Sequence, residues 1–262
     1  MAPMAGVTDA AYRIMCRRRG AEMAYTEMVS VAGLSYKSAK TWVLVEPEPE
    51  EPQICVQLFG TKPEQFAFAV NAVQERVGDK LTLIDINMAC PARKVITKGE
   101  GSALMKEPEL AASLVEACVR EACVPVTVKI RRGFAAGENT AADAVFIARG
   151  TYGNPWVFGD ARALALDGAL VPERGALERI EALREHLTLL HETQPFMARG
   201  RAFSSWYLKG LPHAAAWRGR VVQCTTYEEF MALLDEAETE IIEQSRADSD
   251  AGSPANPQGF GI

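Results

Sequence analysis

The sequence predicts an α/β domain built on a parallel sheet, followed by a small all-helical domain. Two observations lead to this prediction. In the first half of the chain, short apolar runs alternate with helical patterns, as they do in successive βα units. After GNPWVF, Gly153–Phe158, strand-like runs almost vanish. We therefore expect a sheet domain in residues 1–158, a helical domain in residues 159–245 and a disordered polar tail in residues 246–262.

Six short apolar runs are the candidate strands of the sheet. They are Ala2–Ala5, Met23–Thr26, Ile54–Leu58, Leu83–Ile86, Val126–Ile130 and Val145–Ala148. Helix signals lie between them: Asp9 can cap a helix that ends at Gly20, Thr61 precedes one that ends at Gly78, and Pro108 begins a third. In the second domain, helical periodicity covers Leu177–Glu192, Trp206–Leu211 and Tyr227–Gln244.

The composition excludes several classes of protein. No apolar run approaches the length needed to cross a bilayer, and the start MAPMAGVTD lacks the layout of a signal peptide. We therefore expect a cytoplasmic protein without a membrane partner. The six cysteines form no CxxC pair and have no histidine at metal-ligand spacing, so we expect no metal site.

The charge is unevenly distributed along the chain. A net charge of −6 by itself argues against a nucleic-acid partner. Residues 197–220, however, contain five basic side chains and no acid, whereas Glu228–Asp250 is almost purely acidic. The basic block fits either a solvated helix face or a contact with nucleic acid.

Polar residues follow or end several predicted strands. Gln57 lies in VQLFG, Asn87 and Cys90 follow the fourth run, Lys129 ends the fifth, and Arg149 follows the last. In parallel α/β folds the carboxyl ends of the strands carry the active site. No glycine-rich dinucleotide fingerprint follows the first run, so a barrel is favoured over a doubly wound sheet.

The residue types at this edge fit a flat ring with a phosphate tail, which is the shape of FMN. Lys129 can place a positive charge beside an electron-rich ring, and Gln57 offers a donor and an acceptor to a ring edge. Arg149 suits a phosphate, and Gly150 lets the backbone approach it closely. Taken singly, each residue fits a salt bridge at the rim or a hydrogen bond that braces a loop better than it fits a cofactor contact.

Cys90 is the cysteine that the pattern singles out for chemistry. A nucleophilic cysteine usually has a nearby histidine that lowers its pKa, and His186, His191 and His213 all lie in the helical domain. A thiol with an ordinary pKa of about 8.5 keeps its proton at neutral pH. Cys90 is therefore a candidate general acid.

Seven motifs, taken in order, resemble those of the bacterial tRNA-dihydrouridine synthases. They are APMAGVTD, VQLFG, DINMACPARKV, GSALM, VTVKIRRG, ARGTYGNPW and WYLKGLP, and they run from Ala2 to about Trp217. The resemblance implies an FMN-binding (β/α)8 barrel followed by a small helical tRNA-binding domain. It also implies an enzyme in which NADPH or NADH reduces the flavin, which then reduces uridine in tRNA to dihydrouridine.

The resemblance assigns roles to individual residues. Hydride from the flavin would reach C6 of the uracil, and Cys90 would protonate C5 from the opposite face. Asn87 would lie between flavin and base. The residues implied in cofactor binding are Pro3, Met4, Ala5, Gln57, Lys129, Ala148, Arg149 and Gly150. Those implied in tRNA contact, besides Asn87, are Arg131, Arg199, Arg201 and Lys209.

The chain departs from the family between KIRRG and ADAVFIARG, where two βα units are missing. The segment RGFAAGENTAADAV joins the fifth unit directly to the eighth strand, and Arg131–Asp143 is barely long enough for a crossover. The sequence thus predicts an incomplete (β/α)8 barrel with about six strands, weak FMN retention and low or absent activity. The alternatives are an inactive remnant that binds tRNA through its basic helical domain, and an FMN barrel that acts on a free pyrimidine.

Overall fold

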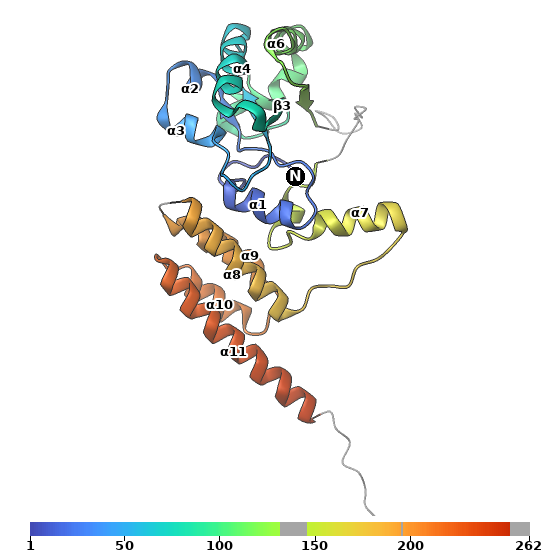
Figure 1. Ribbon diagram of the computed structural model, residues 1–262, viewed down its shortest axis with the longest axis vertical. Coiled ribbons are helices and arrows are strands. Elements are labelled where there is room, and N and C mark those ends of the chain that lie inside the picture. Colours follow the sequence, from blue (N-terminus) through green and yellow to red (C-terminus); the bar gives the residue numbers. More distant parts are fainter. Residues whose placement is uncertain (132–145, 195, 252–262) are drawn as a thin grey trace, which may run out of the picture. The chain divides into compact units, whose positions relative to one another are not determined.

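The computed structural model describes residues 1–131, 146–194 and 196–251 (Figure 1). The chain divides into two compact units, of which the first is Met1–Leu170 and the second begins at Val171. The predicted junction at 132–143 and the end of the predicted tail, 252–262, lie outside the described residues.

The described residues of the first unit form a parallel sheet of four strands in the order β1-β2-β3-β4. The strands are β1 (Val29–Ser30), β2 (Ile54–Phe59), β3 (Leu81–Asn87) and β4 (Val126–Lys129). In their register Gln57 lies beside Asp85, and Asn87 lies beside Lys129. Sequential parallel strands joined by helices confirm the predicted fold class, the sheet of an incomplete α/β barrel.

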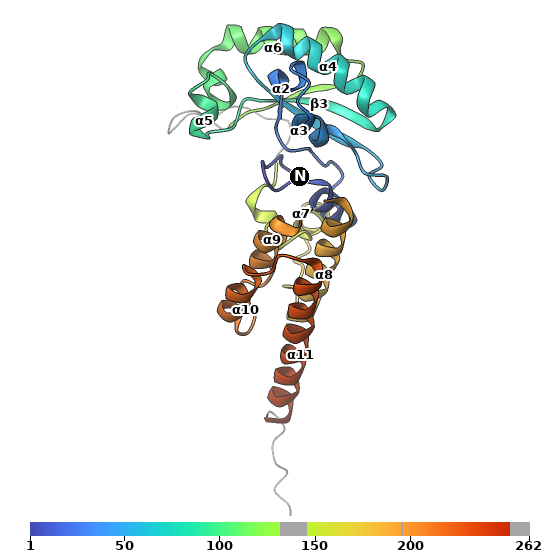
Figure 2. The same cartoon turned by 90° about the vertical axis from the view of Figure 1, so that its left-hand side faces the viewer.

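Some of the helices of the first unit pack against one face of this sheet. The helical elements of the first unit are α1 (Ala10–Arg18), α2 (Val31–Ser35), α3 (Ala39–Trp42), η1 (Val43–Val45), α4 (Pro63–Val77), η2 (Gly78–Lys80), α5 (Arg93–Ile96), η3 (Gly101–Lys106), α6 (Pro108–Glu121), η4 (Arg149–Thr151) and α7 (Val157–Asp167). Figure 2 shows α2, α4 and α6 over the same face of the sheet.

The caps explain where two of these helices begin and end. The side chain of Asp9 accepts a hydrogen bond from the backbone N–H of Tyr12 at 2.9 Å, as expected of an N-cap. Pro63 occupies the first turn of α4, and Gly78 ends the helix with φ of 60°. The N-cap of α4 is Lys62, so the helix begins one residue later than Thr61 predicts.

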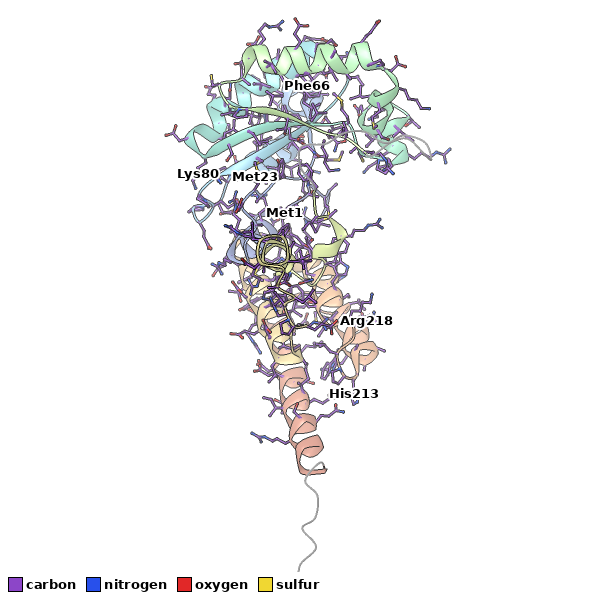
Figure 3. The ribbon with its side chains drawn as sticks, turned by 90° about the vertical axis from the view of Figure 1, so that its right-hand side faces the viewer. Met1, Met23, Phe66, Lys80, His213 and Arg218 are labelled. Carbon is purple, nitrogen blue, oxygen red and sulfur yellow. The ribbon has the colours of Figure 1, made fainter. Side chains whose placement is uncertain are left out.

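The main core of the first unit lies between the sheet and its helices. It contains alternate side chains of the strands, such as Val56 and Ile84, together with buried residues of α2, α4 and α6. Phe66 of α4 is fully buried there (Figure 3). On the opposite face of the sheet, Tyr25, Cys55 and Leu83 form a smaller cluster against which Phe146 packs. This smaller cluster therefore faces the interior that a complete barrel would enclose.

Three of the six predicted strands are confirmed, as β2, β3 and β4. The prediction for Ala2–Ala5 is wrong, because these residues are not in a strand; one backbone bond joins Ala2 N–H to the carbonyl of Ile147 at 2.9 Å. Met23–Thr26 contributes only an isolated bridge, between Tyr25 and Cys55. Residues 146–148, the described part of the sixth run, are also not in a strand. A strand needs a ladder of consecutive bonds. Met23–Thr26 makes two backbone bonds with Cys55, whereas Ala2–Ala5 and residues 146–148 are joined by the one bond between Ala2 and Ile147.

α7 belongs to the first unit, which therefore extends beyond residue 158. Arg162 of α7 forms an exposed ion pair with Glu22 at 2.6 Å. The Arg19 guanidinium lies 5.3 Å from the centre of the Trp156 ring. A β-carbon added at Gly20 would lie 3.2 Å from the backbone of Gly159. These contacts join the segment before and within α7 to the end of α1.

In the residues that the structure describes, the second unit contains helices and turns but no strand, as predicted. Its elements are α8 (Ala176–Thr193), η5 (Met197–Arg199), α9 (Gly200–Tyr207), α10 (Ala214–Val221) and α11 (Tyr227–Ala251). Trp206–Leu211 lies at the end of α9 rather than forming a helix of its own, because Leu208–Leu211 turns away after Tyr207. α11 continues to Ala251, so residues 246–251 are helical, contrary to the predicted tail.

Candidate active site

Four polar side chains from three neighbouring strands form a hydrogen-bonded chain on the face of the sheet opposite α2, α4 and α6. Thr127 Oγ1 donates to Asp85 Oδ1 at 2.6 Å, and Gln57 Nε2 donates to Asp85 Oδ2 at 2.5 Å. Asn87 Nδ2 in turn donates to Gln57 Oε1 at 2.7 Å. Gln57, Asp85 and Asn87 are buried. Side chains two residues apart on a strand share a face, which is why β3 presents both Asp85 and Asn87 here.

Cys90 is connected to this chain through its backbone. Asn87 Oδ1 accepts hydrogen bonds from the N–H groups of Cys90 at 3.0 Å and of Ala89 at 3.2 Å. The carbonyl of Cys90 accepts one from the N–H of Ser102 at 3.0 Å. The turn after β3 is thus held from both sides.

The thiol of Cys90 differs from those of the core cysteines. Cys90 is half-buried, whereas Cys16, Cys55 and Cys118 are buried. Burial raises the pKa of each of these three thiols to about 12. They are therefore inert near neutral pH, in agreement with their interpretation as small core residues.

Lys129 joins the same group of residues from β4. Its carbonyl accepts a hydrogen bond from Met88 N–H at 2.9 Å, next to Asn87 in the register. Burial lowers the pKa of Lys129, and the nearby carboxylate of Asp85 and thiol of Cys90 oppose that shift. Lys129 Nζ also lies 5.8 Å from the centre of the Phe146 ring. The structure therefore brings together Gln57, Asn87, Cys90 and Lys129.

Asp85 is a residue of this site that the sequence reasoning missed. Burial raises the pKa of its carboxyl group to about 6, although hydrogen bonds from Gln57 and Thr127 and the charge of Lys129 act in the opposite direction. The available signal was a carboxylate inside the apolar run LTLIDI, since acidic side chains are seldom fully buried without partners.

The N-terminal segment forms a turn rather than the end of a strand. Met4 N–H donates to Thr8 Oγ1 at 3.1 Å, and the Thr8 hydroxyl donates back to the Met4 carbonyl at 3.2 Å. Gly6 N–H donates to the carboxylate of the buried Glu27 at 2.6 Å. Pro3 and Met4 are half-buried and Ala5 is exposed. Glu27 is a second acidic residue that the sequence reasoning missed.

The predicted phosphate residues form a short turn beside that segment. Arg149 and Gly150 begin η4 and are exposed, while Ala148 is half-buried. Thr151 anchors the turn, since its hydroxyl lies 2.5 Å from the hydroxyl of Tyr12 and donates to the Ala148 carbonyl at 2.7 Å. The bond between Ala2 and Ile147 links this turn to the N-terminal one. An exposed guanidinium on a braced turn can contact a phosphate.

These residues fit part of what an FMN molecule needs. The Gln57 amide uses one hydrogen atom and one lone pair within the chain of bonds, so each end retains capacity for one more hydrogen bond. Lys129 supplies a positive charge and Arg149 an exposed donor. The predicted tRNA contact Arg131 is exposed, two residues after the end of β4.

The remaining tRNA candidates lie in the second unit. Arg199 is half-buried, Arg201 is half-buried and donates its Nε–H to the carbonyl of Cys224 at 2.8 Å, and Lys209 is exposed. The basic block around them is partly neutralised, because Arg220 forms an exposed pair with Glu236 of α11 at 2.7 Å. In the sequence these two residues belong to separate blocks, Arg220 to the basic one and Glu236 to the acidic one, so their pairing is not visible there.

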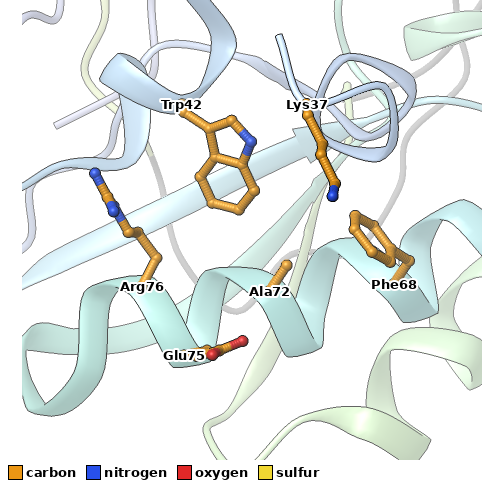
Figure 4. Close-up of a pocket in the computed structure, with 6 residues that line it drawn as sticks. All are labelled: Lys37, Trp42, Phe68, Ala72, Glu75 and Arg76. Atoms are coloured by element: carbon orange, nitrogen blue, oxygen red, sulfur yellow. The ribbon is translucent and has the colours of Figure 1, made fainter. Parts of the chain in front are cut away.

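A surface pocket of the first unit lies elsewhere. It is lined by Lys37, Trp42, Phe68, Ala72, Glu75 and Arg76, with Trp42 and Lys37 facing α4 (Figure 4). None of the predicted site residues lines it. Within the described parts of the chain, no group of three His, Cys, Asp or Glu side chains could hold a metal ion. The same parts contain no helix long and apolar enough to span a membrane.

Comparison with known proteins identifies similar chains. The family model described as "Dihydrouridine synthase (Dus)" matches residues 1–141 and 134–244. The chain is 31% identical to tRNA-dihydrouridine synthase B of Xanthomonas campestris, with 89% of this chain and 90% of the relative covered. It is 30% identical to tRNA-dihydrouridine synthase B of Pseudomonas aeruginosa, with 88% of this chain and 92% of the relative covered. It is 28% identical to probable tRNA-dihydrouridine synthase 1 of Synechocystis, with 90% of this chain and 84% of the relative covered.

The alignment with the Xanthomonas protein spans 302 positions, more than the 262 residues of this chain. The relative therefore has residues without a counterpart here. The two family-model matches meet at residues 134–141, which fall between β4 and η4.

Proposed function

The chain belongs to the dihydrouridine synthase family, and on that premise we propose that it is an FMN-dependent tRNA-dihydrouridine synthase whose activity is impaired by an incomplete barrel. The observation that carries the proposal is the chain of bonds from Gln57 through Asn87 to the backbone of Cys90, with Lys129 beside it. It brings one thiol, one cation and two amides to the interior face of the sheet.

Each of these residues has a role in the proposed reaction. FMN, reduced by NADPH or NADH, would supply the hydride for C6 of the uracil. Cys90 would donate its thiol proton to C5, because a half-buried thiol beside the site can reach the substrate and act as a general acid. Gln57 would hold the ring edge, and Lys129 would stabilise negative charge on the ring. Asn87 would lie between ring and base.

Further residues of the first unit would complete cofactor binding. Pro3, Met4 and Ala5 would line the ring from the turn that Thr8 holds in place. Ala148, Arg149 and Gly150 would bind the phosphate from the neighbouring turn. The bond between Ala2 and Ile147 supports this pairing of the two turns.

The second unit would bind the tRNA. The reaction requires the tRNA to be held, because the target base must leave its stack to enter a pocket. Arg199, Arg201 and Lys209 would contact phosphates, and Arg131 of the first unit would do the same. The groove between α10 and α11 is less suitable, since Asp235, Glu236, Glu240 and Glu243 line it. A tRNA substrate also places the proposed activity in the cytoplasm.

Several observations support the proposal that two βα units are absent from this chain. The aligned relative carries residues that this chain lacks. Every residue of β4 is half-exposed, whereas β2 and β3 are almost wholly buried, as expected if the units that would cover β4 are absent. Phe146 packs against Tyr25 and near Lys129, so it occupies interior space beside the proposed ring contact. We therefore propose weak FMN retention and low activity.

A second candidate function is an inactive remnant that binds tRNA. The half-exposed β4 and the position of Phe146 favour it, because both reduce the space and support for a flavin. The basic side chains of the second unit do not depend on the missing units.

One experiment separates the two candidates. The absorbance spectrum of the purified chain, followed by addition of NADPH and of unmodified tRNA, tests for flavin, its reduction and dihydrouridine. A yellow protein that bleaches and forms dihydrouridine supports the synthase, and Cys90→Ala should then keep the bleaching and lose the product. A colourless protein that still shifts tRNA in a gel supports the remnant. A protein with neither property contradicts both.

A further inference from the structure

The hydrogen bonds that begin at Asp85 have a fixed direction. An ionised carboxylate only accepts hydrogen bonds, so the end of the Gln57 amide that faces Asp85 has to be its NH2 group. The carbonyl oxygen of Gln57 then faces Asn87 and accepts from its NH2 group. Asn87 is left with its oxygen toward the N–H groups of Ala89 and Cys90, which can only donate.

Neither amide can turn over without losing bonds at both ends. A reversed Gln57 would place its oxygen against the Asp85 carboxylate and its NH2 group against the NH2 of Asn87. A reversed Asn87 would place its NH2 group against two backbone donors. The three side chains are at most 3% exposed, so water cannot easily replace a lost partner.

We infer that Asp85 is a positioning residue that holds the backbone of Cys90 in place through Gln57 and Asn87. It does not touch the thiol; it determines the orientation of the two amides, and the second amide binds the turn that carries the thiol. That this positioning affects catalysis rests on the proposed function. The positioning of Cys90 itself does not rest on the proposed function, because it is set by hydrogen bonds within this chain alone.

The burial of Asp85 is consistent with such a role. Its carboxyl group has a raised pKa because it is kept in a poorly solvated place, and the neighbouring strands supply Thr127, Gln57 and Lys129 to offset that burial. A charge kept inside a fold at this cost is more common where a site needs it.

The test measures how fast a thiol reagent modifies Cys90, read by mass spectrometry on the Cys90 peptide so that exposed Cys123 does not interfere. Asp85→Leu removes the acceptor for the Gln57 amide. Through Gln57 and Asn87 this should change the rate of Cys90 modification by about tenfold, which corresponds to the loss of one net hydrogen bond that holds the turn. Asp85→Asn can still present an oxygen to Gln57 and should restore most of the wild-type rate. Thr127→Val removes the other bond to Asp85, off the path to Cys90, and should leave the rate unchanged.

The result that overturns the inference is equal rates in the wild type and Asp85→Leu, or equal changes in Asp85→Leu and Thr127→Val. If Asp85→Leu does not fold, Gln57→Leu interrupts the same chain one bond further along and should give the same change. The measurement needs neither flavin nor tRNA. A colourless, inactive protein would therefore contradict the proposed function and still leave this inference to be decided by the thiol rates.

Discussion

The carbonyl oxygen of Cys90 lies directly against Gly101. A β-carbon added at Gly101 would come within 2.7 Å of that oxygen and 3.1 Å of the Cys90 β-carbon. Gly101 also has a φ of 62°, which side chains other than glycine rarely adopt. The turn that carries the thiol is therefore enclosed by Asn87 on one side and by the start of η3 on the other.

Replacing Gly101 should disturb that turn. Gly101→Ala should cost the left-handed backbone penalty of about 1 kcal/mol and a further 1–3 kcal/mol for the overlap with Cys90. Gly99→Ala is the matched control, because Gly99 has a φ of 77° and its nearest neighbour would be the methyl group of Thr61 at 3.7 Å. Urea unfolding measures both losses, and equal losses would contradict the role of the overlap.

The ion pair between Arg13 and Glu51 should be important for stability. Both side chains are buried, with 4% and 0% exposed, and two bonds of 2.6 Å join them. Glu51→Ala leaves a buried, unpaired guanidinium and should lower the free energy of unfolding by about 3–5 kcal/mol. The neighbouring pair Arg18–Glu50 is 41% and 48% exposed, so Glu50→Ala should cost less than about 1 kcal/mol. Chemical denaturation that gave similar losses for the two variants would refute this ranking.

Stability should depend on the ionisation of Asp85. The pKa of its carboxyl group is about 6 in the folded protein against an ordinary value of 3.8, so the folded state binds the proton more tightly. This contribution is fully present below pH 3.8 and is lost as the pH rises through 6, a change of about 3 kcal/mol. The measurement is the difference in unfolding free energy between the wild type and Asp85→Asn, which should fall from pH 4 to pH 7.

Burial shifts the pKa values of the groups that face Asp85. It lowers the pKa of Lys129, whereas Asp85 and Cys90 act in the opposite direction. Burial raises the pKa values of Tyr25 and Cys55, so both stay neutral. A difference in unfolding free energy that is constant between pH 4 and pH 7 would show that Asp85 is not the group responsible.

Supplying the missing βα units should improve flavin retention. A chimaera that carries the corresponding segment of the Xanthomonas relative between Arg131 and Phe146 would cover the half-exposed β4. We expect bound FMN, measured by its absorbance after gel filtration, to rise toward one molecule per chain. A glycine–serine insert of the same length is the control. If the two inserts gave the same flavin content, the deletion would not explain weak retention.

Lys209 should contribute to tRNA binding. Lys209→Glu should weaken binding and reduce the slope of log affinity against log salt by about one, as expected when one phosphate contact is removed. Lys40→Glu in α3 changes the net charge equally, on another exposed lysine outside the second unit, and should leave the slope unchanged. Filter binding over a range of salt concentrations measures both, and identical slopes for the two variants would exclude the contact.

The sequence by itself determined the local parts of this protein. Pro63 and Gly78 mark the start and end of α4, Asp9 caps α1, and three apolar runs became β2, β3 and β4 close to their predicted bounds. Backbone preference and the pattern of apolar residues act over a few residues, and both are visible along a single chain. The ordered motifs likewise identified the family before any contact was known.

Only the tertiary structure decided which residues act together. Asp85 is a lone acid in an apolar run until the register places Gln57 beside it and Thr127 donates from the next strand. Ala2–Ala5 has a strand-like composition but does not form a strand, since strand formation depends on neighbours that are distant in sequence. Hydrogen-bond partners and burial depend on how separate segments meet, and no pattern within one segment contains that information.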